Sequence, residues 1–151
     1  MSDTELSALR SCEDTALAFC DRLDEGDLDA AFALHADGLR FFPPGGSTPM
    51  GRDAARQDAA RVRFAYPGRG TLHVLSGFRG RLLGDGTVAA SYLMTVYELT
   101  SPHGDQARPL ETPRVFALAR EEAVFVRDEN GSWVYTEQRM IPIGATPKAR
   151  T

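Results

Sequence analysis

Residues 71–99 read TLHVLSGFRGRLLGDGTVAASYLMTVYEL and predict two long strands joined by a tight turn. Apolar and polar side chains alternate on both sides of Gly84-Asp85-Gly86, whose composition is typical of a hairpin turn. We expect the strands to span Thr71–Leu83 and Thr87–Leu99, with a bend or bulge at Gly77 and Gly80. This hairpin predicts an antiparallel sheet.

The residues before the hairpin predict helices. Apolar side chains recur at three- and four-residue steps through residues 6–23, after a Ser2-x-x-Glu5 capping box and before Gly26. The remaining predicted elements are a helix at 27–35, a strand at 39–42, a helix at 53–64 and strands at 113–127 and 132–143. Helices followed by a run of strands predict an α+β domain over residues 1–143, with a flexible tail at 144–151. We expect the helices to pack on one face of a curled antiparallel sheet and to enclose a cone for a small apolar ligand.

The composition excludes several classes of protein. The chain has 151 residues, 42% of them hydrophobic, which is enough for one ordinary core and too many for a disordered chain. No apolar run is long enough to span a bilayer, and a net charge of −4 disfavours binding to nucleic acid. The N-terminal residues lack a signal-peptide pattern, and Cys12 and Cys20 are too far apart in one helix to pair. We therefore expect a cytoplasmic protein that binds neither a membrane nor nucleic acid.

Two residues are the main candidates for catalysis. Asp24 directly follows the last apolar residue of the first helix, and His73 shares a strand face with Thr71 and Leu75. An imidazole in an apolar cone suits proton transfer near neutral pH, and it needs an acceptor that fixes its tautomer. Asp24 is the candidate for that acceptor, although a helix-end acid and a strand histidine also occur as purely structural residues.

The strand after the hairpin offers further candidates. Tyr92 could donate to a developing oxyanion, and Glu98 brings a carboxylate close to the mouth of the cone, unless it is a solvated strand end. The predicted pocket lining is Phe19, Phe41, Phe64, Tyr66, Met94 and Glu98. The three histidines are widely separated and no Cys-x-x-Cys is present, so we expect no metal and no organic cofactor.

Several stretches together resemble a known family. They are FCDRLDEGDLDAAFAL at 19–34, ADGLRF at 36–41, MGRDA at 50–54 and TLHV at 71–74. Over residues 5–142 the chain is similar to the SnoaL-like domain of the nuclear transport factor 2-like (NTF2-like) superfamily. The similarity is greatest to its scytalone dehydratase and polyketide cyclase branch, and it implies a cystatin-like α+β barrel.

The resemblance also implies a function. In the dehydratase-like branch an acid at the end of the first helix orients a histidine in a Thr-x-His strand, and Asp24 and His73 match these positions. The second histidine of that branch is replaced by Glu98, and its tyrosine before the acid is replaced by Leu23. The implied activity is lyase, isomerase or cyclase chemistry on a small apolar cyclic or polyketide-like substrate.

The alternative is a non-catalytic relative. It would be a ligand-binding domain, or an assembly subunit of the dioxygenase β type. By analogy with the family we expect a homodimer, with a trimer as the other option. Phe125, Trp133 and Tyr135 would be suitable contacts, because aromatic residues are enriched in interface cores.

Overall fold

A computed structural model describes residues 2–64, 69–100 and 113–145, with the backbone alone at 63, 64, 69, 100 and 145. The elements in chain order are α1 (Asp3–Glu25), α2 (Leu28–Phe32), β1 (His35–Phe42), α3 (Arg52–Phe64), β2 (Arg69–Leu82), β3 (Val88–Thr100), β4 (Arg114–Arg127) and β5 (Trp133–Ala145). Each predicted helix and strand is present. Only α2 and β1 differ by more than two residues from the predicted bounds.

Helix α1 begins and ends where its sequence signals predict. The Ser2 hydroxyl accepts a hydrogen bond from the Glu5 amide at 3.2 Å, and Gly26 has the left-handed conformation (φ 84°) that ends the helix. Asp27 then caps α2, because its side chain accepts from the Ala30 amide at 3.0 Å. These caps fix the position of Asp24 in the last turn of α1, directly before the chain reverses.

Helix α2 ends earlier than predicted. The helical hydrogen bonds stop near Phe32, and the Leu34 carbonyl accepts from the Tyr135 amide at 2.9 Å instead. The chain therefore enters β1 at His35, which the sequence had placed at the end of a helix. The helix stops here because the Leu34 carbonyl binds the amide of Tyr135 in β5 and not an amide of a further helical turn.

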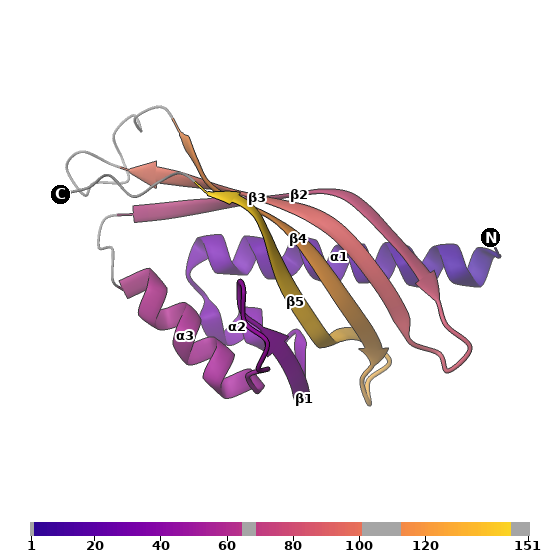
Figure 1. Ribbon diagram of the computed structural model, residues 1–151. Coiled ribbons are helices and arrows are strands. Elements are labelled where there is room, and N and C mark those ends of the chain that lie inside the picture. The colour runs from indigo at the N-terminus through magenta and orange to yellow at the C-terminus, as the bar shows by residue number, and fades with distance from the viewer. Residues whose placement is uncertain (1, 65–68, 101–112, 146–151) are drawn as a thin grey trace.

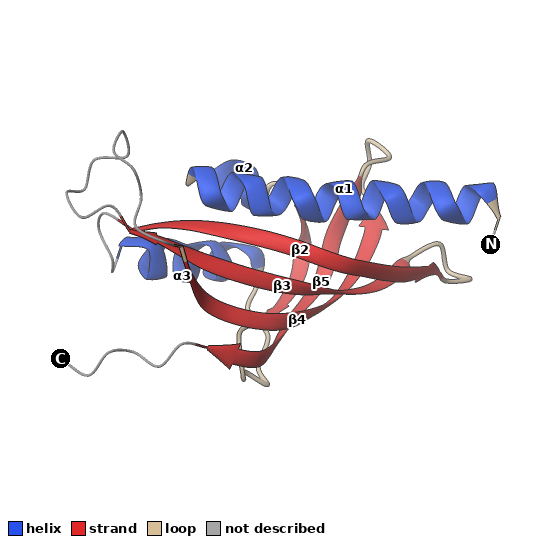
Figure 2. Cartoon of the chain, turned by 90° about the horizontal axis from the view of Figure 1, so that it is seen from above, coloured by secondary structure: helices blue, strands red, loops and turns tan. Residues whose placement is uncertain are grey.

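The five strands form a single sheet in the order β1-β5-β4-β3-β2. Strands β2 to β5 pair antiparallel, whereas β1 pairs parallel with β5, so the sheet is mixed rather than wholly antiparallel. It is curled but not closed, and the helices lie on one side of it (Figure 1). Helix α1 runs alongside β2 (Figure 2), and α3 packs against β1 and α2.

The predicted bulge in β2 lies at Gly77. The register between β2 and β3 shifts between Ser76 and Arg79, and Gly77 has a φ of 64°. Gly80 is paired with Ala90, and its role is close packing: a Cβ placed there would lie 2.8 Å from a methyl carbon of Leu9 on α1.

The core lies between α1 and the inner face of the sheet. Its aromatic part includes Phe19 from α1 and three residues of the last two strands, Phe125, Trp133 and Tyr135. All four are buried, so the prediction that the last three are dimer contacts is wrong. Alternation shows correctly that they share a face, but it does not show which face the helices cover.

Candidate functional site

Asp24 and His73 are in direct contact. The Nδ1 atom of His73 lies 2.6 Å from Oδ1 of Asp24, and the His73 backbone amide donates to Oδ2 at 2.8 Å. The Thr71 hydroxyl also donates to Oδ1, at 3.0 Å. A single carboxylate thus binds both ends of the Thr71-x-His73 segment.

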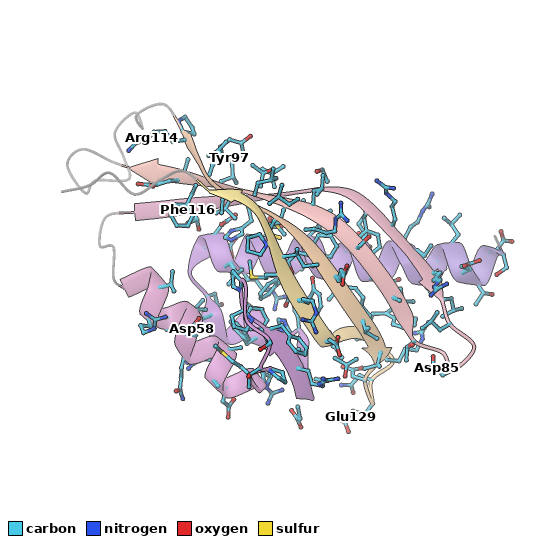
Figure 3. The ribbon with its side chains drawn as sticks, viewed as in Figure 1. Asp58, Asp85, Tyr97, Arg114, Phe116 and Glu129 are labelled. Carbon is cyan, nitrogen blue, oxygen red and sulfur yellow. The ribbon has the colours of Figure 1, made fainter. Side chains whose placement is uncertain are left out.

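Strand alternation and the cap of α1 explain this contact. Leu72 and Val74 are 45% and 40% exposed, so Thr71 and His73 point to the opposite, helix-covered face. Because α1 packs along β2, the carboxylate in its last turn meets that face. His73 is paired with Val96, close to the sheet end where Tyr97 and Phe116 lie (Figure 3).

The hydrogen bonds determine the charge on Asp24. Burial alone would raise its pKa, but bonds from the His73 ring and backbone and from Thr71 outweigh burial, so the pKa lies below its ordinary value of 3.8. The carboxylate is therefore ionised at neutral pH and accepts a hydrogen bond from Nδ1 of His73. In the neutral tautomer that this bond selects, Nε2 carries the lone pair, and no residue that the structure describes is hydrogen-bonded to it.

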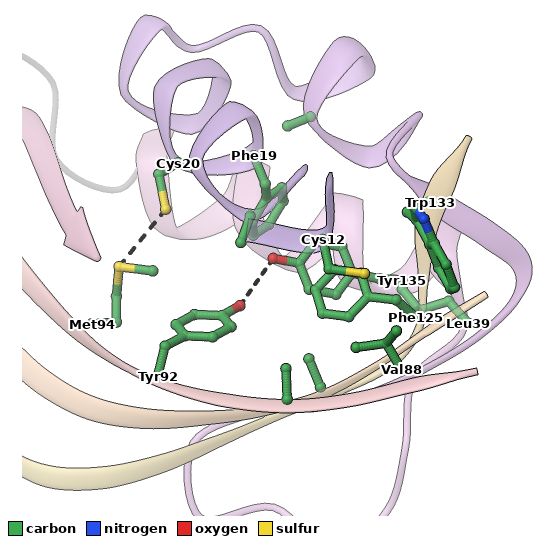
Figure 4. Close-up of a cluster of buried hydrophobic side chains, with 14 of the residues drawn as sticks. Cys12, Phe19, Cys20, Leu39, Val88, Tyr92, Met94, Phe125, Trp133 and Tyr135 are labelled. Carbon is green, nitrogen blue, oxygen red and sulfur yellow. Dashed lines mark hydrogen bonds between the residues drawn. The ribbon is translucent and has the colours of Figure 1, made fainter. Parts of the chain in front are cut away.

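Tyr92 lies deeper in the core than the Asp24–His73 pair. Its hydroxyl is 2.9 Å from that of Tyr135, and the Sγ atom of Cys20 is 3.8 Å from Sδ of Met94 (Figure 4). Burial raises the pKa of Tyr92 well above 10, so it stays protonated. It is four residues along β3 from Val96, or about 13 Å, so the structure does not bring Tyr92 and His73 together.

The other predicted pocket residues are divided between core, rim and undescribed parts of the chain. Phe19 and Met94 are buried in the core, and Phe41 is partly buried beside it. Glu98 is half-buried at the strand end, paired with Thr71. The side chain of Phe64 and the whole of Tyr66 lie outside the described residues.

A buried polar cluster also lies on the inner face. His35, Glu121 and Gln138 are each at most 3% exposed. The Nε2 atom of His35 is 3.0 Å from Oε1 of Gln138, and Nε2 of Gln138 donates to Oε2 of Glu121 at 3.3 Å. Sequence reasoning missed this cluster, although alternation along β4 places Glu121 on the same face as the buried Phe125.

Neither surface groove contains the Asp24–His73 pair. One groove of about 480 Å³ lies over the outer face of the sheet and includes Arg79, Arg81, Glu122 and Glu137. A second of about 480 Å³ lies between α2 and α3. We regard the pair as the candidate site because its groups can transfer a proton, whereas the grooves are shallow and charged.

Within the part of the chain that the structure describes, no group of three His, Cys, Asp or Glu side chains is arranged to hold a metal ion. None of the described helices is both long and apolar enough to cross a bilayer.

The comparisons with known proteins identify the fold. No family model and no curated protein matches the sequence. Among solved structures, a Catenulispora acidiphila protein in complex with S-DNPA superposes with a TM-score of 0.77 at 16% identity, covering 91% of this chain and 95% of that one. A candidate scytalone dehydratase from Novosphingobium aromaticivorans has a TM-score of 0.76 at 17% identity, covering 100% and 94%. An NTF2-like protein with a cystatin-like fold, from the same organism, has a TM-score of 0.71 at 18% identity, covering 96% and 88%. The chain therefore has the cystatin-like α+β fold, and the predicted fold class is confirmed.

Proposed function

We propose that this chain is an enzyme in which His73, held by Asp24, transfers a proton on a small cyclic or polyketide-like compound. The reaction is of the lyase, isomerase or cyclase type. The observation that carries the proposal is the triple hydrogen bond from Thr71 and His73 to one carboxylate. An ionised aspartate at Nδ1 fixes the tautomer in which Nε2 can accept a proton.

Two further observations support this proposal. The side chains of His73 and Asp24 are 18% and 16% exposed, so they are shielded but still within reach of a ligand. Of the similar structures, one is named for scytalone dehydratase and another contains the small molecule S-DNPA. The proposed chemistry needs no metal or organic cofactor, because the proton moves between carbon or oxygen and an imidazole.

The test is turnover of two kinds of ring compound by the purified protein. Ketones with a β-hydroxyl report loss of water, and β,γ-unsaturated ketones report a shift of the double bond; both yield conjugated products that absorb in the ultraviolet. His73→Ala should lower kcat/KM by about 10²- to 10⁴-fold. Asp24→Asn should lower it as well, because an amide favours the wrong tautomer.

Leu72→Ala is the matched control, because Leu72 is the neighbour of His73 on the exposed face. It should leave turnover unchanged. Equal activity of wild type and His73→Ala, with both folded, would exclude the proposed role of the imidazole.

A second candidate function is assembly through the outer face of the sheet. This face carries exposed apolar side chains at Leu72, Val74, Leu93, Val115, Ile141 and Ile143. Apolar surface on neighbouring strands favours pairing with another sheet, and a homodimer is the expected assembly. Leu93→Lys, at the middle of the face, should shift the mass measured by light scattering from dimer to monomer. Leu17→Lys, on the exposed side of α1, should not. A monomeric wild-type protein would exclude this function.

A further inference from the structure

A chain of hydrogen bonds crosses the core from β4 to the end of α2. Glu121 on β4 contacts Gln138 on β5 at 3.3 Å, and Gln138 contacts Nε2 of His35 on β1 at 3.0 Å. The backbone carbonyls of Ala31 and Phe32, at the end of α2, face the His35 ring and favour a proton on it. The three side chains are at most 3% exposed, so their hydrogen-bond partners must come from within the protein.

One ring nitrogen of His35 has no partner in this chain. Because the amide nitrogen of Gln138 donates to Glu121, the amide oxygen faces Nε2 of His35, which must carry the ring proton. Nδ1 is then left with a lone pair beside backbone carbonyls, which are acceptors too. It is buried and makes no hydrogen bond to a described residue. This arrangement suits an ionised Glu121, but it leaves His35 incompletely paired.

A proton on Glu121 adds a second group without a partner. Burial raises the pKa of Glu121 from 4.5 to about 8, so the acid is protonated at neutral pH. Its Oε1 has no hydrogen-bond partner among the residues that the structure describes, and the amide nitrogen opposite Oε2 cannot accept. While Gln138 keeps this orientation, both the acid O–H and Nδ1 of His35 stay unpaired, and each buried unpaired group costs free energy.

A half-turn of the Gln138 amide pairs both groups. The amide oxygen and nitrogen exchange places without a change of shape, so the surrounding core does not have to move. The oxygen then accepts the proton of Glu121, and the nitrogen donates to Nε2 of His35. With Nε2 as acceptor, the ring proton resides on Nδ1, where it can be donated to the carbonyls at the end of α2. Every polar side chain from Glu121 to α2 is then paired.

Glu121 is the group whose protonation selects between the two arrangements. The other ionisable groups described around the chain of hydrogen bonds are those of Cys20, Tyr92, Tyr135 and Arg52. Burial raises the pKa of the cysteine to about 12 and holds those of the two tyrosines well above 10, and a guanidinium stays charged throughout. Burial also lowers the pKa of His35 to about 4, so its ring stays neutral. Of these groups, Glu121 alone changes charge between weakly acid and weakly alkaline pH.

We propose that Glu121, Gln138 and His35 form a proton switch that connects the core of the sheet to the end of α2. When Glu121 is protonated, Gln138 turns its oxygen to the acid and His35 donates from Nδ1 to α2. When the proton of Glu121 leaves to solvent, the amide turns back, the ring proton returns to Nε2 and the bond to α2 is lost. Phe32, at the end of α2, lines the groove between α2 and α3, so the switch acts on a surface groove. It does not depend on the proposed function.

The test is a pH titration of the whole chain followed by nuclear magnetic resonance. The 15N frequencies of an imidazole show which nitrogen carries the proton, and the carboxyl 13C frequency of Glu121 shows its charge. The three histidines of the chain are assigned by single substitution. We expect the proton of His35 on Nδ1 at pH 6 and on Nε2 above pH 9, with one midpoint near 8 for both residues. The carbonyl 13C frequencies of Ala31 and Phe32 should shift with the same midpoint.

Three variants test the separate parts of the switch. In Glu121→Gln the new amide can donate to Gln138 at every pH, so His35 should keep its proton on Nδ1 up to pH 9.5. In Gln138→Met the link is removed, so Glu121 should still titrate while the tautomer of His35 no longer follows it. Glu122→Gln is the matched control, because Glu122 is the next residue of β4 and is exposed. Its titration of His35 should equal that of wild type.

Four results would overturn the switch. They are a constant His35 tautomer in wild type from pH 6 to 9.5, a wild-type change of tautomer in Glu121→Gln, a tautomer that still follows Glu121 in folded Gln138→Met, and the same loss of the transition in Glu122→Gln as in Glu121→Gln. The first of these needs no substitution at the switch, so the titration of wild type decides the question even where a variant does not fold.

Discussion

The buried acid at Glu121 gives the protein a measurable dependence of stability on pH. Its pKa is 4.5 in the unfolded chain and about 8 in the folded one. Between these values the folded state binds one more proton than the unfolded state, so the free energy of unfolding falls as pH rises. Above about 8 both states are ionised, and the loss is complete.

His35 acts in the opposite direction over part of this range. Burial lowers its pKa from 6.5 to about 4, so the unfolded chain binds the extra proton and stability rises with pH up to 6.5. The two groups therefore cancel between about pH 4.5 and 6.5. Between 6.5 and 8 only Glu121 contributes, at about 1.4 kcal/mol for each pH unit, which gives a loss of about 2 kcal/mol.

Urea unfolding of wild type and Glu121→Gln at several pH values measures this loss. The two proteins should have similar stability near pH 5, where Glu121 is protonated and nearly isosteric with glutamine. Wild type should then lose about 2 kcal/mol between pH 6.5 and 8, while Glu121→Gln should lose none. Parallel curves for the two proteins across this interval would show that Glu121 is already ionised in the fold.

Three further changes test the fold and the site. Asp24→Ala should lower the free energy of unfolding by about 1.5 to 3 kcal/mol, because it leaves the donors of Thr71 and His73 unpaired. Since the pKa of Asp24 lies below 3.8, the difference in stability between wild type and variant should disappear as pH falls through that lowered value. Equal urea midpoints for the two proteins at neutral pH would contradict this prediction. Gly77→Ala should lower the free energy of thermal unfolding by about 1 to 2 kcal/mol, because φ is 64° at this residue. Gly84→Ala, where an added Cβ meets open space, should lower it less. Equal melting temperatures for the two variants would argue against the bulge. Phe125→Ala should lower the free energy of unfolding, measured by calorimetry, by about 3 to 5 kcal/mol and leave the oligomeric state unchanged. Dissociation of the oligomer without loss of stability would instead show that Phe125 lies in an interface between subunits.

The order of helices and strands could be predicted because each element carries its own pattern. The helical period of α1, its caps and the alternation in β2 and β3 are all local signals. The partner of β1 is not a local property, because parallel pairing with β5 depends on a contact between Leu34 and Tyr135 across the chain. The same contact explains why His35 is a buried residue of β1 and not the last residue of a helix, as predicted.

The candidate site also has a part that local sequence patterns predict and a part that depends on contacts between distant residues. The Asp24–His73 pair was predicted because both residues lie at marked positions, one at the end of a helix and the other in a Thr-x-His strand. Glu121 carried a usable signal, since one of two adjacent glutamates in a strand must face inward. Its bond to Gln138 depends on the register between β4 and β5, which no local pattern specifies.

The environments of Asp24 and Glu121 explain how two carboxyl groups on one face of the sheet can have opposite charge states. Asp24 accepts three hydrogen bonds and lies near the surface, so its charged form is favoured. Glu121 accepts one bond from a neutral amide and is 2% exposed, so its uncharged form is favoured. Between the lowered pKa of Asp24 and the raised pKa of Glu121, the first carboxyl group is ionised and the second is protonated. The two carboxyl groups therefore differ in charge at the same pH, because the protein surrounds them differently.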